Sequence, residues 1–167
     1  REECDAALDA LRQDQDLEFL CSASSKDVEA CDALRSLATP HKRARHVVSE
    51  NERVIESAAA LADADLARLG QLMYASHVSL RDDFQVSCPE LDILVETAMS
   101  VPGVLGSRMT GAGFGGCTVS LVASSAVPDF VETVRDKYST ATPYHAEVIR
   151  CHTGDGVKRL SEERASA

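Results

Sequence analysis

The residues of this sequence best placed to do chemistry are four glycines within the six positions 111–116: Gly111, Gly113, Gly115 and Gly116. Glycine adopts positive φ angles and lets another group approach the backbone closely, whereas a plain hairpin turn needs only one or two glycines. The cluster therefore predicts either a tight crossover packed against other backbone or a loop whose N–H groups lie near an anion. We favour the functional loop.

The glycine spacing also matches the G-x-G-x-x-G pattern of dinucleotide-binding folds. That fingerprint requires a helix directly after the glycines, with its N-terminus facing the pyrophosphate. Residues 117–122 read Cys-Thr-Val-Ser-Leu-Val, a composition that predicts a strand instead. No Gly-Lys-Ser/Thr closes the loop, so it is not a Walker A loop either.

Two other polar groups could carry chemistry, and each has a plainer structural interpretation. Ser76, His77 and Asp82 could form a hydrolase triad, but no G-x-S-x-G motif accompanies them, and local contacts at a helix end explain them better. His46 and Glu50 are one helical turn apart, as metal ligands can be. No second His or Cys lies in register with them, so a surface pair is favoured.

The cysteines point to a reducing compartment and not to a disulfide framework. The sequence has six, and none forms a C-x-x-C pair. Four fall on apolar faces of predicted elements, where a free thiol packs as a small hydrophobe. Cys88 begins a predicted helix, where the helix dipole favours a thiolate, but the sequence pairs it with no base.

Composition narrows the class of protein. The 167 residues are 44% hydrophobic and 26% charged, which predicts a single folded domain over 1–167. The net charge of −10 argues against a nucleic-acid partner. Residues 40–46 are the one basic segment of the sequence, and we expect them to form a solvated helix face. No apolar run approaches the roughly 18 residues of a membrane span. We therefore expect a cytoplasmic protein with no membrane partner.

The elements that must position these residues change in kind near residue 102. Before it, apolar residues recur at helical spacing, and the segment 1–100 is predicted to be mainly helical. Helices are predicted at 4–11, at 28–34, from Thr39-Pro40 to 62, at 66–80, and from a capping box at 87–90 to residue 98. Ser24 or Ser25 is the expected N-cap of the second of these helices.

Residues 104–160 are predicted to form a sheet with one helix. Strands are expected at 104–109, 117–123 and 144–151, a helix at 127–138, and a terminal strand at 157–160. The fold class is therefore α+β, with a helical half packed on a small antiparallel sheet.

Four runs of this sequence resemble the galactokinase family of the galactokinase/homoserine/mevalonate/phosphomevalonate (GHMP) kinase superfamily. Residues 106–117 (GSRMTGAGFGGC) look like the third superfamily motif, and 43–48 (RARHVV), 76–83 (SHVSLRDD) and 86–92 (VSCPELD) resemble conserved runs before it. The similarity covers essentially the whole chain. It implies the ferredoxin-like C-terminal domain of the superfamily, with Gly111, Gly113, Gly115 and Gly116 beside the nucleotide phosphates at a cleft between two lobes.

The resemblance also implies a reaction: transfer of the γ-phosphoryl group of ATP, with Mg²⁺, to the 1-hydroxyl of α-D-galactose. The family's sugar-binding signature, phosphate loop, and catalytic Asp with its partner Arg lie in an N-terminal lobe and have no match here. We therefore assign no catalytic or metal-binding residue to this chain, and expect it to be inactive without that lobe. The alternatives are an N-acetylgalactosamine kinase, a noncatalytic sugar sensor on the same scaffold, or a stand-alone binding or regulatory module.

Overall fold

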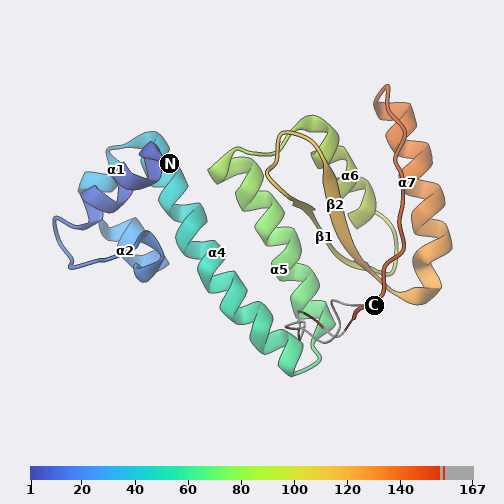
Figure 1. The fold of residues 1–167 in the computed structure, drawn as a ribbon, viewed down its shortest axis with the longest axis horizontal. Coiled ribbons are helices and arrows are strands. Elements are labelled where there is room, and N and C mark those ends of the chain that lie inside the picture. The colour runs from blue at the N-terminus through green and yellow to red at the C-terminus, as the bar shows by residue number, and fades with distance from the viewer. Residues whose placement is uncertain (155, 157–167) are drawn as a thin grey trace, which may run out of the picture.

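The structure is a computed structural model that describes residues 1–154 and 156, and its elements form two groups joined by one long helix (Figure 1). In chain order the elements are α1 (Glu2–Leu11), the short η1 (Leu20–Ser22), α2 (Ser25–Ala30), α3 (Asp32–Arg35), α4 (Ala38–Ala62), α5 (Leu66–Ser79), the π-helical turn η2 (Leu80–Phe84), α6 (Pro89–Met99), β1 (Val104–Thr110), β2 (Cys117–Val122), η3 (Ser124–Ala126) and α7 (Val127–Ala141). Helices α1 to α3 gather on one side of α4, while α5 lies along its other side.

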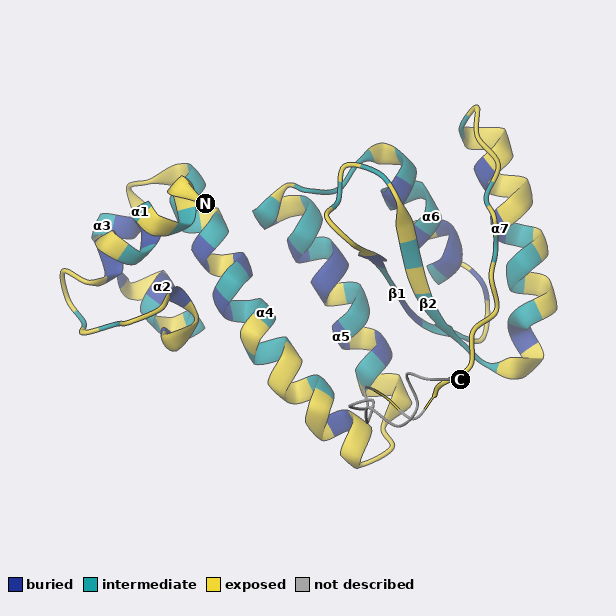
Figure 2. Ribbon diagram, in the orientation of Figure 1, coloured by how far each residue is buried: buried dark blue, intermediate teal, exposed yellow. Residues whose placement is uncertain are grey.

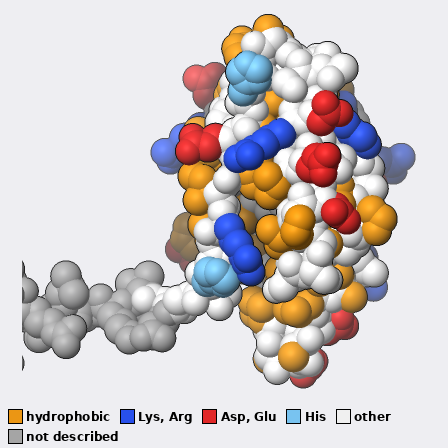
Figure 3. Space-filling view, turned by 90° about the vertical axis from the view of Figure 1, so that its right-hand side faces the viewer, with side chains coloured by type: hydrophobic (Ala, Val, Ile, Leu, Met, Phe, Trp, Pro, Cys, Tyr) orange, Lys and Arg blue, Asp and Glu red, His pale blue; other side chains and the backbone are white. Residues whose placement is uncertain are grey.

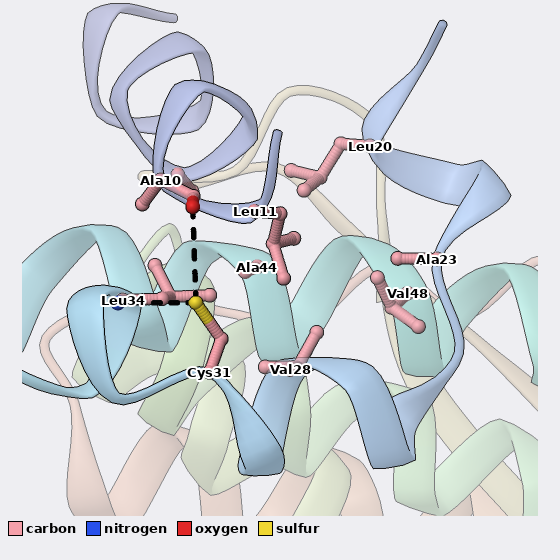
Figure 4. Packing of buried hydrophobic residues seen from close by; sticks show 10 residues of the cluster. Ala10, Leu11, Leu20, Ala23, Val28, Cys31, Leu34, Ala44 and Val48 are labelled. Atoms are coloured by element: carbon pink, nitrogen blue, oxygen red, sulfur yellow. Dashed lines mark hydrogen bonds between the residues drawn. The ribbon is translucent and has the colours of Figure 1, made fainter. Parts of the chain in front are cut away.

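The first hydrophobic core lies between α1, α2, α3 and the N-terminal half of α4 (Figures 2 and 4). Leu11, Val28 and Leu34 are fully buried there against Ala44 and Val48 of α4. Burying an aliphatic side chain of this size stabilises a fold by about 1.5–3 kcal/mol. The apolar stripe predicted for residues 28–34 is therefore correct, although the chain breaks it into two short helices at Cys31 (φ −79°, ψ 103°).

The second core lies around β1, which contacts α5 and α6, while α7 packs on α6. Its buried side chains are Leu72, Leu91, Val95, Met109 and Val134. Strands β1 and β2 form an antiparallel pair in which Thr110 faces Cys117 across the ladder. The α+β class with a small antiparallel sheet is confirmed, and α6, β1, β2 and α7 supply the central helix–strand–strand–helix part of a ferredoxin-like arrangement.

The helix ends match the sequence in part. Ser24, one of the two serines predicted as N-cap, is the N-cap of α2, and it forms a capping box with Asp27 that the sequence analysis did not predict. Pro89 occupies the first turn of α6, but the predicted box at 87–90 is wrong, since the Ser87 hydroxyl donates to Asp92 instead (2.6 Å). Helix α4 starts at Ala38, so Thr39 lies inside the helix and is not its cap.

The apolar stripe predicted along α4 is buried in its first half only. Val54, Ile55 and Leu61 are 60%, 64% and 57% exposed. Helices α1 to α3 cover the N-terminal half of α4, and its far end extends beyond them (Figure 2). The periodicity identified the helix correctly but could not show how much of its length is covered.

The strand predicted at 144–151 does not form. The described residues after Thr142 belong to no helix or strand, and they run back alongside α7. An open groove separates the two, lined by Val131 and Arg135 of α7 and by His145, Ala146 and Glu147 (Figure 3). Within the described residues the sheet therefore has two strands, β1 and β2. The terminal strand predicted at 157–160 lies outside the described residues.

All six cysteines are free, and Cys31 is buried. The Cys31 thiol contacts the Ala10 carbonyl at 3.8 Å (Figure 4). Within the part of the chain that the structure describes, no helix is both long enough and apolar enough to cross a membrane.

Candidate functional site

The four glycines lie in the loop that joins β1 to β2. All four have positive φ, where the sequence predicts it for one or more of them. The φ angles are 89° at Gly111, 85° at Gly113, 140° at Gly115 and 103° at Gly116. Phe114 between them also adopts a positive φ, 59°, and its side chain is 74% exposed. Strand β2 follows the loop directly, so the helix that a dinucleotide fingerprint requires is not there.

The glycines have two different surroundings. A Cβ on Gly113 would lie 2.2 Å from the carbonyl oxygen of Val86, so this glycine is required by close packing. Next to it, the Phe114 N–H donates to the same carbonyl at 2.8 Å. At Gly111, Gly115 and Gly116 no described atom outside the adjacent residues lies within 4 Å of a Cβ position. The tight crossover is therefore correct for Gly113. The other three glycines leave open backbone, and their place near an anion stays a prediction.

Val86, whose carbonyl accepts this hydrogen bond, directly follows a strained turn at the end of α5. The π-helical turn η2 ends at Gln85, which has φ 61° and ψ 45° although it is not glycine. The Arg43 guanidinium of α4 donates to the Asp83 carbonyl (2.5 Å) and to the Gln85 side chain (3.0 Å), and pairs with Glu3 of α1 (2.7 Å).

Two neighbours of Arg43 on α4 hold the same turn by its side chains. Arg45 forms an ion pair with the largely buried Asp83 at 2.7 Å. The His46 ring stacks on Phe84 with centroids 4.6 Å apart, and its Nδ1 lies 3.0 Å from the Ser79 hydroxyl. Burial lowers the pKa of His46. The expectation of a solvated basic face at 40–46 is therefore wrong for Arg43 and His46, which are mostly buried and paired, whereas Arg45 is paired but exposed.

A polar cluster centred on Glu50 joins α4, α5 and β1. The Glu50 carboxylate accepts from the Ser76 hydroxyl (2.6 Å), from Arg53 (2.8 Å) and from Arg108 of β1 (3.2 Å). Burial raises the pKa of Glu50, but the hydrogen bonds from Ser76 and Arg53 and the two positive charges outweigh it, so the pKa lies below its ordinary value. The carboxylate stays charged and connects Arg108, just before the glycine loop, to two helices.

The hydrolase triad considered for Ser76, His77 and Asp82 does not form. Ser76 points to Glu50, Asp82 pairs with Arg81, and His77 lies fully buried beside β1. The His77 Nδ1 accepts from the Met109 N–H at 3.4 Å, and its Nε2 is 3.2 Å from Asp92. Burial lowers the pKa of His77 more than the Asp92 charge raises it. The interpretation as local contacts at a helix end holds for Asp82 only. It is wrong for Ser76 and His77, whose partners lie on α4, β1 and α6.

The remaining candidates do not assemble into a metal site. His46 faces Ser79 while Glu50 faces Ser76 and two arginines. Among the residues that the structure describes, no group of three or more His, Cys, Asp or Glu side chains could hold a metal ion. Cys88 is the N-cap of α6 and lines a pocket of about 300 Å³ together with Phe114 and Gly115.

Sequence reasoning missed the contacts that connect α4 to the glycine loop. Arg43 is 42 positions from Gln85, and Glu50 is 58 positions from Arg108. The basic run at 40–46 was the available signal, because charges that end up paired look in a sequence like charges that face water.

Comparison with known proteins gives the class to which this arrangement belongs. Residues 57–140 match the family described as GHMP kinases C terminal, a span that contains α5, α6, the whole sheet and the glycine loop. The chain belongs to the GHMP kinase family.

The relatives within that class are galactokinases. The chain is 48% identical over 164 residues to the galactokinase of Roseiflexus sp. (strain RS-1), covering 97% of this chain and 41% of that protein. It is 42% identical over 163 residues to the galactokinase of Bacillus subtilis (strain 168), covering 98% and 42%. The crystal structure of Lactococcus lactis galactokinase complexed with galactose superposes with a TM-score of 0.82 at 41% identity, covering 86% of this chain and 37% of that one. The chain thus spans about two fifths of the length of these relatives.

Proposed function

We propose that this chain is the C-terminal lobe of a galactokinase, which transfers the γ-phosphoryl group of ATP to the 1-hydroxyl of α-D-galactose. The observation that carries the proposal is the similarity to galactokinases along nearly the whole chain, at 48% identity to the Roseiflexus relative. The Lactococcus relative was crystallised as a complex with galactose, which supports this sugar as the acceptor. Six free thiols are compatible with a cytoplasmic enzyme.

The role proposed for this lobe is to form one wall of the phosphate site. Among the residues that the structure describes, nothing beyond the adjacent residues lies within 4 Å of a Cβ position at Gly111, Gly115 or Gly116, so a phosphate could approach their backbone. Phosphoryl transfer depends mostly on positioning and electrostatic stabilisation, and a rigid loop of bare backbone contributes to both. The Glu50 cluster and the Val86 carbonyl fix the loop from two sides.

The described residues fit ATP and Mg²⁺ differently. The open glycines suit a phosphate, whereas no acidic cluster within 1–154 and 156 suits a divalent cation. We therefore derive no step through Mg²⁺ from this chain, and assign the metal ligands and the acceptor-orienting carboxylate to the rest of a galactokinase.

A chimera tests the proposal directly. This chain would replace the part of the Roseiflexus galactokinase that it matches, and the protein would be purified from a host that lacks galactokinase. We expect galactose-dependent ADP release and formation of galactose 1-phosphate. A chimera that is folded by circular dichroism and still has no turnover would contradict the proposal.

The 167-residue chain alone provides the complementary measurement. Removing a group of residues that act together leaves only residual catalysis, so we expect no galactose 1-phosphate from this chain alone. Calorimetry should give an affinity for ATP or galactose no tighter than about millimolar, roughly −4 kcal/mol. Tight binding of either ligand to the isolated chain would instead favour a stand-alone binding module.

A further inference from the structure

We propose that Arg43 is a positioning residue for the glycine loop: by holding Gln85 in its left-handed conformation, it aims the Val86 carbonyl at the Phe114 N–H. The inference extends the proposed function, because it concerns the loop assigned there to the phosphates. The proposal concerns the hydrogen bond from the Phe114 N–H to the Val86 carbonyl, which we call the joint between the turn and the glycine loop. The protection of this hydrogen bond can be measured without any catalysis.

Two unusual backbone conformations flank this joint. Gln85 (φ 61°) directly precedes the acceptor Val86, and Phe114 (φ 59°) is itself the donor. Residues with a Cβ rarely adopt positive φ, and they keep it only where the surroundings determine it strongly. Such strain concentrates at functional loops, and here it occurs on both sides of one hydrogen bond.

The contacts of Arg43 explain how Gln85 keeps its conformation. One nitrogen, Nη1, donates to the carbonyl of Asp83 and to the side chain of Gln85, so it bridges the residues on either side of Phe84. The guanidinium carbon also lies 5.8 Å from the centre of the Phe84 ring. A single group therefore fixes the backbone before Gln85 and the side chain of Gln85 itself.

Arg43 is itself held in place. Its side chain is 13% exposed, and its Nε pairs with Glu3 of α1 at 2.7 Å. A mostly buried planar guanidinium with three acceptors loses little further freedom when it holds the turn. Arg45 and His46 contact the Asp83 carboxylate, Phe84 and Ser79, so they support the turn without reaching Gln85.

The contacts of Val86 connect the turn to the glycine loop. The Val86 N–H donates to the Leu80 carbonyl (3.1 Å), which closes the turn, and the Val86 carbonyl receives Phe114 (2.8 Å). Gly113 packs so closely on that carbonyl that a Cβ would lie 2.2 Å from it. A shift of Val86 therefore moves Gly113 and Phe114, the middle of the glycine loop.

The test is amide hydrogen exchange in the 167-residue chain, followed by NMR. In Arg43→Ala we expect the Phe114 amide to exchange at least about tenfold faster, while amides of α1 and of the β1–β2 ladder change by less than about threefold. The control is Glu3→Ala, which removes the ion pair of Arg43 and leaves its two hydrogen bonds to the turn. We expect this variant to keep the Phe114 amide protected.

A rescue distinguishes positioning from general stabilisation. Gly adopts positive φ without strain, so Gln85→Gly does not need the guanidinium. The double variant Arg43→Ala/Gln85→Gly should restore Phe114 protection to within about threefold of the parent chain. If Arg43→Ala does not fold, Arg43→Lys replaces it, because a single ammonium on a flexible stem lacks the planar fork that reaches all three acceptors.

Three results would overturn the inference: unchanged exchange at Phe114 in the Arg43 variant, an equal loss of protection throughout the chain, or failure of the double variant to recover. None of these measurements uses galactose or ATP. The positioning role of Arg43 can therefore be disproved while the chimera is active. Equally, the chimera can be inactive while Arg43 still positions the loop.

Discussion

Gly70 of α5 and Gly106 of β1 place their backbones in direct contact. A Cβ on Gly70 would lie 2.0 Å from the Leu105 carbonyl oxygen, and a Cβ on Gly106 would lie 2.2 Å from the Gly70 carbonyl oxygen. The helix therefore packs on the strand with no side chain between them at this point. This close approach brings Ser76 and His77, further along α5, to Arg108 and Met109 just before the glycine loop.

We expect Gly70→Ala to destabilise the chain, because the new methyl group meets backbone that cannot rotate away. Overpacking of this kind costs about 1–3 kcal/mol or more, and the gain in helix propensity offsets about 1 kcal/mol of it. Urea unfolding followed by circular dichroism measures the change. The matched control is Gly154→Ala, where a Cβ meets no described atom beyond the adjacent residues within 4 Å. A control as destabilised as Gly70→Ala would contradict the packing argument.

Substitutions in the glycine loop should separate function from packing. In the chimera, Gly115→Val should lower kcat/KM for ATP by about tenfold or more, because the side chain fills open space over the backbone. Its cost in stability is limited to the strain of positive φ, about 1–2 kcal/mol. Gly113→Ala should lose both activity and stability, since its Cβ meets the Val86 carbonyl. Steady-state kinetics with unchanged kcat/KM in folded Gly115→Val would rule out a role at the phosphates.

The stability of the chain should fall as the pH is lowered from about 7 to about 5. The pKa of His77 and that of His46 are both lowered by burial, so the unfolded chain binds more protons than the folded chain below the ordinary histidine pKa of about 6.5. Each histidine contributes a slope of at most about 1.4 kcal/mol per pH unit. Urea unfolding at several pH values measures it. His77→Gln should be less stable at pH 7 but have a shallower slope, and an equal slope would exclude His77 as a source.

Glu50→Gln should lower the stability of the chain more than the same substitution does at the surface. The neutral amide weakens the contacts with Arg53 and Arg108 while both arginines stay partly buried, which costs about 1–3 kcal/mol. Glu56→Gln is the matched control, since Glu56 pairs with Arg68 on the exposed side of α4 and α5. We expect less than about 1 kcal/mol there. Thermal unfolding of the two variants gives the comparison, and equal effects would mean that the Glu50 cluster adds little.

Local signals in the sequence predicted most of the elements. Helical periodicity located α1, α5, α6 and α7, the serine before residue 25 marked the start of α2, and alternating β-branched residues marked β2. Positions 144–151 carry a strand pattern equally well, yet pairing depends on an available edge, which a local pattern does not contain. Val54 and Ile55 likewise fit the local pattern of a buried helix face. They are exposed because α1 to α3 do not extend far enough along α4 to cover them.

The candidate site was predictable where backbone conformation decides it. Four glycines in six residues predicted positive φ at one or more of them, and the structure has it at each one. The supporting contacts were not predictable, because Arg43 with Gln85 and Glu50 with Arg108 depend on how α4 crosses α5 and β1. The residue types were visible in the sequence, but their partners are a property of the packed helices.

Helix α4 contributes to both halves of the molecule. Ala44 and Val48 fill the core with α1 to α3, while His46 and Glu50, on the same turns of the helix, reach α5. Unfolding on either side would therefore remove partners from the same 25-residue helix. Folding of the two halves is coupled through this shared element, and we expect calorimetry to record one cooperative transition in place of two independent ones.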